Sequence, residues 1–126
     1  MLTEDDYPML IEALRRSGEA NSFNRHAALI LCPTSTKILA KSRIPYPEIE
    51  LDPTVELLLR LGHSRGARLV CNYVPDSTVA KMLVFSTIRY IYIMQDYYLQ
   101  DQDINPAGIE LLKSKGRTVI FSYHHM

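Results

Sequence analysis

The sequence predicts an α/β protein, a three-layer α/β/α sandwich built around a five-stranded mixed sheet whose strands three to five are parallel. Amphipathic helical stretches and short apolar runs follow one another in the order αββαβαβαβ. In the second half, helices separate the third, fourth and fifth strands, and right-handed crossovers of this kind join parallel strands. The first two strands are joined by a short turn and are expected to be antiparallel.

The first half of the chain is expected to contain two helices and two strands. Thr3 caps a helix in which apolar residues recur at spacings of three and four. Residues 26–32 and 37–41 form a hairpin, and the first of these runs is continuously apolar, as in a central strand. After an irregular loop, Asp52 caps a second helix with Pro53 at its first position, which is a favoured arrangement.

The second half alternates strands and helices. Its three strands are expected at residues 69–73, 88–94 and 118–123. Asp76 or Ser77 caps the helix after the first of these strands, and Gly116 ends the helix before the last one. The alternation predicts parallel pairing of these three strands, with the helices that separate them covering the sheet.

Charge and composition exclude several classes of function. Lys+Arg and Asp+Glu balance at 14 each over 126 residues, so no overall field attracts the chain to nucleic acid or to an anionic membrane. No apolar run approaches the roughly 20 residues of a membrane span, and the N-terminus is acidic. Cys32 and Cys71 lie in apolar runs and are expected to be buried free thiols. We expect one domain, residues 1–126, in the cytoplasm.

One stretch of the second half has a specific pattern. Pro75, Ala80 and Lys81 surround the predicted start of the third helix, and Ile88-Arg89 opens the next strand. This frame resembles the second metal motif of the zinc-dependent nucleotide deaminases, in which P-C-x-x-C-A-K opens a helix. The two cysteine positions of that motif hold Asp76 and Val79 in this chain.

The resemblance extends over nearly the whole chain and is strongest from residue 66 to residue 121. The order of elements is similar to that of the cytidine deaminase-like fold, and the pattern most resembles the deoxycytidylate deaminases. Apart from the metal motif, the matching segments are Gly66-Ala67, Asp96-Tyr97-Tyr98, Asp101-Gln102-Asp103, Leu111-Leu112 and Lys115-Gly116.

In the family that this chain resembles, a histidine and two cysteines hold a zinc ion that activates water, and a glutamate shuttles protons. This chain lacks those ligands. Its four histidines have no glutamate two positions later, and its two cysteines are not spaced C-x-x-C. We therefore expect no catalytic residue, no zinc and no other cofactor.

The counterpart of the family's H-A-E motif belongs at the start of the second helix. Three registers are open: Glu48-Ile49-Glu50, Glu50-Leu51-Asp52, or a match at Glu56. A remnant of the pocket is expected between this helix and the third one, formed by Glu48, Glu50, Glu56, Asp76 and Val79. Carboxylates there are suited to Mg²⁺ or Mn²⁺, but we favour a capping role for Asp76 and solvated glutamates.

Three classes of function follow from these expectations. The first is a catalytically inactive deoxycytidylate deaminase-like protein that acts as an oligomerising interaction or regulatory subunit. The second is a nucleotide-binding module with a remnant pocket, in which Asp76 would repel a phosphate and keep binding weak. The third is a hydrolase with an altered metal site. We favour the first.

The second and third helices are expected to build an interface, and the second helix carries the evidence for it. Residues 55–61 are apolar nearly all round, and a helix of this kind needs a second apolar partner besides the sheet. The interface is expected to include Leu57, Leu58, Leu59 and Leu61. The partner is another copy of this chain or a related deaminase-fold subunit, with no membrane and no nucleic acid involved.

Overall fold

The computed structural model describes residues 2–19, 25–44, 46, 48–62, 67–96 and 106–124. The predicted order of helices and strands is confirmed. The elements are α1 (Tyr7–Glu19), β1 (Ala28–Leu31), β2 (Ile38–Lys41), α2 (Pro53–Leu61), β3 (Arg68–Cys71), α3 (Ser77–Val84), β4 (Tyr90–Asp96), α4 (Ala107–Ser114) and β5 (Thr118–His124).

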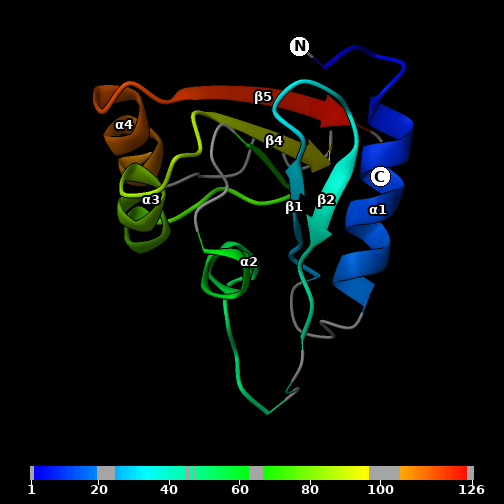
Figure 1. Ribbon diagram of the computed structural model, residues 1–126, viewed down its shortest axis with the longest axis horizontal. Coiled ribbons are helices and arrows are strands. Elements are labelled where there is room, and N and C mark those ends of the chain that lie inside the picture. The colour runs from blue at the N-terminus through cyan, green and yellow to red at the C-terminus, as the bar shows by residue number, and fades with distance from the viewer. Residues whose placement is uncertain are drawn as a thin grey trace.

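The five strands form one mixed sheet in the order β2-β1-β3-β4-β5. β1 is antiparallel to both of its neighbours, whereas β3, β4 and β5 are parallel, as predicted. Figure 1 shows the strong twist of the sheet, with β5 at one edge and β2 at the other. Because β3, β4 and β5 run the same way, their C-terminal ends all lie on the same side of the sheet. The helices that follow β3 and β4 begin on that side.

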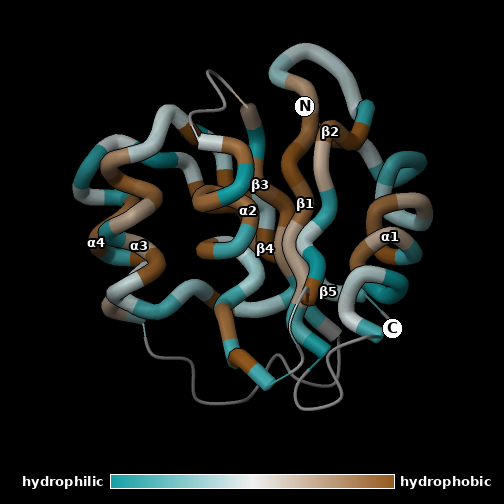
Figure 2. Tube along the Cα trace, turned by 60° about the horizontal axis from the view of Figure 1, so that its bottom comes forward, coloured by the Kyte–Doolittle hydropathy of each residue, from teal (hydrophilic) through white to brown (hydrophobic). Residues whose placement is uncertain are grey.

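Two hydrophobic clusters lie on opposite faces of this sheet and make the sandwich three layers deep. One cluster joins the sheet to α2, α3 and α4 through residues such as Leu57, Leu83 and Leu112. The other joins it to α1 through Leu10 and Leu14. Figure 2 shows α1 on one side of the sheet and the other three helices on the opposite side. Alternate residues of β1 point to the two clusters, which explains its continuously apolar sequence.

Local capping signals act as predicted at three helix ends. Asp52 Oδ1 accepts hydrogen bonds from the amides of Thr54 and Val55 at the start of α2. Asp76 does the same for Val79 in α3. After α4, Gly116 has a φ of 79°, and the amide of Arg117 bonds back to the carbonyl of Leu112.

The predicted strand ends differ at the edge where β3 finishes. His26 and Tyr73, expected within strands, lie just outside β1 and β3. The Asn72 amide still donates to the Ala27 carbonyl there, but the side chain of Asn72 makes the other bonds: its Oδ1 accepts from the Ala27 amide and its Nδ2 donates to the Arg25 carbonyl. β4 has the predicted length but begins and ends two residues later than predicted, since its pairing with β5 runs from Tyr90 to Asp96.

Several residues noted in the sequence, among them Tyr97, Tyr98, Asp101 and Asp103, lie outside the described residues. Within the part of the chain that the structure describes, no helix is long and apolar enough to cross a membrane.

Candidate functional site

The candidate site lies on the side of the sheet where the C-terminal end of β3 meets the starts of α2 and α3. In sheets with parallel strands this edge forms the ligand crevice, because strand ends and helix N-termini converge there. Here the convergence is recorded by hydrogen bonds between the start of α2 and Tyr73, which follows β3. The side chains that meet at this edge decide what chemistry is available.

Asp52, Thr54 and Tyr73 form a closed hydrogen-bonded network. The Tyr73 hydroxyl donates to Asp52 Oδ1 over 2.6 Å, and the Thr54 hydroxyl lies 2.6 Å from the same phenolic oxygen. The Thr54 amide also donates to that oxygen at 3.1 Å. Thr54 is fully buried and Tyr73 nearly so. The network therefore joins α2 to the end of β3, and the hydroxyls of Thr54 and Tyr73 are both engaged within it.

The electrostatics of this network oppose ionisation. Burial, with the neighbouring Cys71 and Asp52, raises the pKa of Tyr73, so its phenol stays protonated. Burial also raises the pKa of Cys71 to about 12, which leaves a thiol rather than a thiolate nucleophile. The His26 ring stacks on the Tyr73 ring with centroids 4.6 Å apart. Burial lowers the pKa of His26, against the opposing charge of Asp52, and favours neutral imidazole.

Sequence reasoning did not identify this network. The sequence predicts a helix cap at Asp52 and strand positions for His26 and Tyr73, and it indicates no role for Thr54. The only indication in the sequence is local. Asp52-Pro53-Thr54 is typical of a helix start, and this start is expected close to the ends of the parallel strands.

Asp76 and Val79 occupy the two cysteine positions of the motif, and both have structural roles. The Asp76 carboxylate accepts the Val79 amide at 2.9 Å, which confirms the predicted cap. The Val79 side chain is only 3% exposed and packs in the cluster between the sheet and α3. One member of the predicted remnant pocket is thus exposed at a helix end, and the other is core.

The three glutamates do not behave alike. Glu48 and Glu50 are exposed, as predicted, but Glu56 is 6% exposed, and its expected solvation is wrong. Its carboxylate accepts from Arg60 Nε at 2.7 Å and from the Arg43 amide at 2.9 Å. A buried carboxylate requires such partners. Glu56 therefore fastens α2 to the chain that leaves β2, and no recorded contact joins it to Asp76.

This arrangement predicts a pH-dependent contribution of Glu56 to stability. Burial alone raises the pKa of Glu56, but the bonds from Arg60 and Arg43 outweigh it and lower that pKa below the ordinary 4.5. A carboxyl with a lowered folded pKa stabilises the fold above its unfolded pKa, and that stabilisation is lost as the pH falls through the folded value.

Replacing Glu56 by Gln should therefore lower the free energy of unfolding by about 2 kcal/mol at neutral pH, because charge-assisted hydrogen bonds are lost. The loss should shrink below about pH 4. Urea titrations of the two proteins at several pH values measure this difference. Glu50→Gln, at an exposed site, is the matched control and should change little. A Glu56→Gln effect that is constant down to pH 3, or absent at pH 7, would contradict the pairing.

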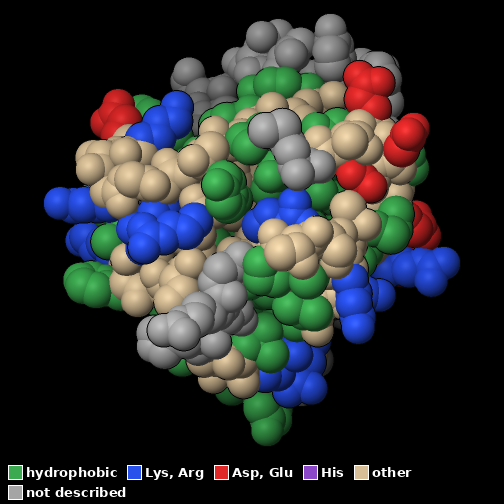
Figure 3. Space-filling view, turned by 45° about the horizontal axis from the view of Figure 1, so that its top comes forward, with side chains coloured by type: hydrophobic (Ala, Val, Ile, Leu, Met, Phe, Trp, Pro, Cys, Tyr) green, Lys and Arg blue, Asp and Glu red, His purple; other side chains and the backbone are tan. Residues whose placement is uncertain are grey.

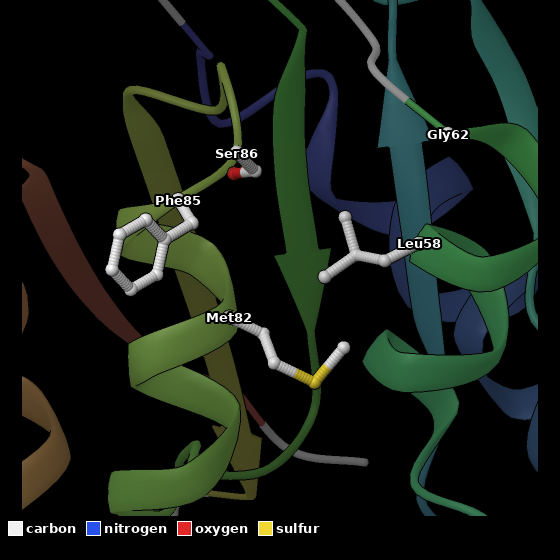
Figure 4. A pocket seen from close by; sticks show the side chains of 5 residues that line it. All are labelled: Leu58, Gly62, Met82, Phe85 and Ser86. Carbon is white, nitrogen blue, oxygen red and sulfur yellow. The ribbon is translucent and has the colours of Figure 1, made fainter.

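An apolar hollow of about 340 Å³ lies between α2 and α3, lined by Leu58, Gly62, Met82, Phe85 and Ser86. In Figure 4, Leu58 from α2 and Met82 from α3 point toward each other, while the Phe85 ring points away from Leu58. Of the residues that line the hollow, Phe85 is 83% exposed. Leu59, which follows Leu58 in α2, is 70% exposed.

The predicted interface set needs one correction. Leu57 is fully buried in the core beneath α2, since its side chain packs against the sheet, and it cannot reach a partner. Leu58 lines the hollow, and Leu59 and Leu61 are exposed. The α2–α3 face is defined below as Leu58, Leu59, Leu61, Met82 and Phe85.

The donor set at the site does not fit a tetrahedral zinc ion. Zinc in proteins is held by three or four Cys, His or carboxylate ligands around one point. Among the described residues, no group of three or more His, Cys, Asp or Glu side chains could hold a metal ion. At the two motif positions, Asp76 is engaged with an amide and Val79 has no lone pair to donate.

Comparisons with known proteins identify the fold. No protein-family model matches the sequence, and no curated protein is significantly similar to it. Among solved structures, a dCMP deaminase from the cyanophage S-TIM5, in complex with dCMP and dUMP, superposes with a TM-score of 0.71 at 19% identity, covering 97% of this chain and 99% of that one.

Two other solved structures have the same architecture. RibD from Acinetobacter baumannii gives a TM-score of 0.67 at 16% identity, over 93% of this chain and 34% of that one. A guanine deaminase from Nitrosomonas europaea gives 0.61 at 15% identity, over 96% and 78%. At these identities the similarity shows a shared fold.

Proposed function

We propose that this chain, which has the cytidine deaminase-like fold, is a catalytically inactive protein of that fold and acts as an oligomerising interaction or regulatory subunit. Its partner is a second copy of itself or a related deaminase-fold subunit. No deaminase step is assigned to its residues.

One observation carries the proposal. At the start of α3, where the resemblance expects two zinc-binding thiolates, Asp76 is bonded to the Val79 amide and the Val79 side chain is in the core. Restoring a ligand at position 79 would require removing a buried core residue. The polar groups across the crevice, Asp52, Thr54 and Tyr73, are hydrogen-bonded to one another. Both features support the proposal that these residues now stabilise the fold and do not take part in catalysis.

The interaction role is supported by the α2–α3 face. Monomeric proteins rarely keep large apolar side chains together beside an apolar hollow unless something binds there. Leu59 and Phe85 are the most exposed members of the face, and Leu58 and Met82 line its hollow. The face is on the surface of the helical layer and away from the Asp52–Tyr73 network.

The test is elemental analysis of the purified protein together with a deaminase assay on dCMP, cytidine and adenosine. We expect much less than one zinc per chain and no turnover, because water activation in this fold depends on the metal. A zinc-dependent dCMP deaminase prepared in the same way is the positive control. One tightly held zinc per chain, or metal-dependent release of ammonia, would refute the proposed inactivity.

A further inference from the structure

The two edges of the sheet differ in how they are protected. An exposed edge strand presents unpaired amides and carbonyls, and natural proteins shield such edges with short strands, bulges and lysines. β2 has all of these: it spans Ile38–Lys41, its pairing with β1 is irregular, and Lys37 and Lys41 lie at its ends. Arg60 Nη2 also donates to the Lys41 carbonyl at 2.6 Å.

β5 has none of these protections. It is seven residues long, pairs regularly with β4 along its whole length, and holds no proline and no Lys, Arg, Asp or Glu. None of its described side chains is fully buried, and Tyr123 is 38% exposed. In Figure 1, β5 forms the upper edge of the sheet. Figure 3 brings this side forward and shows hydrophobic side chains at the surface between groups of charged ones.

The hydrogen bonds of β5 show which groups face outward. The Thr118 amide donates to the Arg89 carbonyl at the start of the ladder with β4. Because neighbouring residues of a strand point their backbone groups to opposite sides, Val119, Phe121 and Tyr123 turn their amides and carbonyls away from β4. Among the described residues, none is recorded as bonding to these outward groups.

We propose that the β5 edge pairs with β5 of a second copy of this chain, antiparallel and centred on Phe121. In this register Phe121 faces the same residue of the other copy, and Val119 faces Tyr123. The three outward residues of each strand then form hydrogen-bonded pairs, and aromatic and β-branched side chains stand opposite one another.

The charge pattern favours a second copy as the occupant. An antiparallel pair of β5 strands brings no like charges together, since residues 118–123 are uncharged. The neighbouring Arg117 is occupied elsewhere, because its guanidinium donates to the carbonyls of Val84, Ser86 and Ile88. Burial lowers the pKa of His124, which packs on Tyr7 and is uncharged at neutral pH.

This contact is separate from the α2–α3 face. It lies at the edge of the sheet, whereas that face is on the helical layer. Two different two-fold contacts in one chain build a closed tetramer when their axes intersect at a right angle, and an open chain of subunits when the axes do not intersect. The β5 contact does not depend on the proposed catalytic inactivity.

The test is amide hydrogen exchange of the full chain, followed residue by residue by NMR at tens and at hundreds of micromolar protein. At the higher concentration we expect the amides of Val119, Phe121 and Tyr123 to exchange at least about tenfold more slowly than at the lower one. The amides of Ile120 and Ser122, which bond to β4, should stay protected at both concentrations and report that β5 is folded.

A pair of substitutions at Tyr123 isolates the backbone hydrogen bond. Tyr123→Pro removes an outward amide without touching the ladder to β4, because proline is tolerated on the free side of an edge strand. It should abolish the concentration-dependent protection of Val119 and Phe121. Tyr123→Ala removes the same side chain and keeps the amide, so that protection should remain.

Two results would overturn the pairing. The first is exchange of the outward amides at unprotected rates even at hundreds of micromolar. The second is protection that stays the same in a sample diluted until light scattering finds only monomer, which would mean that the edge is covered within one chain. Leu59→Glu, which is directed at the α2–α3 face, should leave the β5 protection intact, so failure of one interface is distinguishable from failure of the other.

Discussion

Replacing Gly108 by alanine is expected to destabilise the protein by about 3 kcal/mol, enough to lower its melting temperature by about 10 °C. Gly108 lies in the first turn of α4, at the point where this helix meets the start of α3. A Cβ added there would stand 2.8 Å from the Asp76 carbonyl oxygen and closer still to that of Pro75. Backbone atoms cannot rotate away, so one of the two helices must move.

Gly116→Ala is the matched control. That residue has a φ of 79° and nothing within 4 Å of an added Cβ, so alanine meets only the cost of the left-handed conformation, about 1 kcal/mol. Thermal and urea unfolding of the two variants measure the difference. Equal effects, or a neutral Gly108→Ala, would show that α4 does not begin against residues 75 and 76. A shift in the position of Asp76 would also disturb its cap on Val79.

Much of the fold was predictable because its signals are local. The caps at Asp52 and Asp76 and the stop at Gly116 each act within about four residues, and a sequence displays them directly. Parallel pairing of β3, β4 and β5 followed from the intervening helices. The position of β1 between β2 and β3 did not, since long-range pairing leaves no local signal.

The candidate site was less predictable because its partners are distant in sequence. Tyr73 reaches Asp52 across 21 positions, and nothing near Tyr73 identifies that contact. Glu56 is the same residue type as Glu48 and Glu50, yet only Glu56 is buried. The sequence does indicate an ion pair between Glu56 and Arg60, because a spacing of four residues puts both side chains on one face of a helix. Burial of the pair depended on where α2 packs.

The same residues also hold the helical layer in place. Asp52 serves at once as the cap of α2 and as the acceptor for Tyr73, so an apolar residue there would remove three hydrogen bonds together. At the opposite helix start, Asp76 caps α3 while its carbonyl packs against Gly108. Both helix starts are therefore fixed by contacts that hold the α2, α3 and α4 layer on the sheet.

The second large expected effect concerns the association of chains through the α2–α3 face. We expect the unmodified protein to be a dimer or larger at tens of micromolar, and Leu59→Glu to weaken that association on the order of a hundredfold. Leu59 is 70% exposed, so glutamate is well solvated in the single chain and would not disturb its core. In the assembled state the same carboxylate would be buried against apolar side chains, at a cost of several kcal/mol.

Light scattering and sedimentation over a range of concentrations measure the association. Met9→Glu is the matched control, because Met9 is also an exposed apolar residue on a helix, but on α1, away from the α2–α3 face. It should leave the association unchanged. Phe85→Ser should weaken it as Leu59→Glu does, since Phe85 is 83% exposed beside the hollow that Leu58 and Met82 line. An unmodified protein that is monomeric at tens of micromolar would contradict the assembly role and leave the α2–α3 face without a partner.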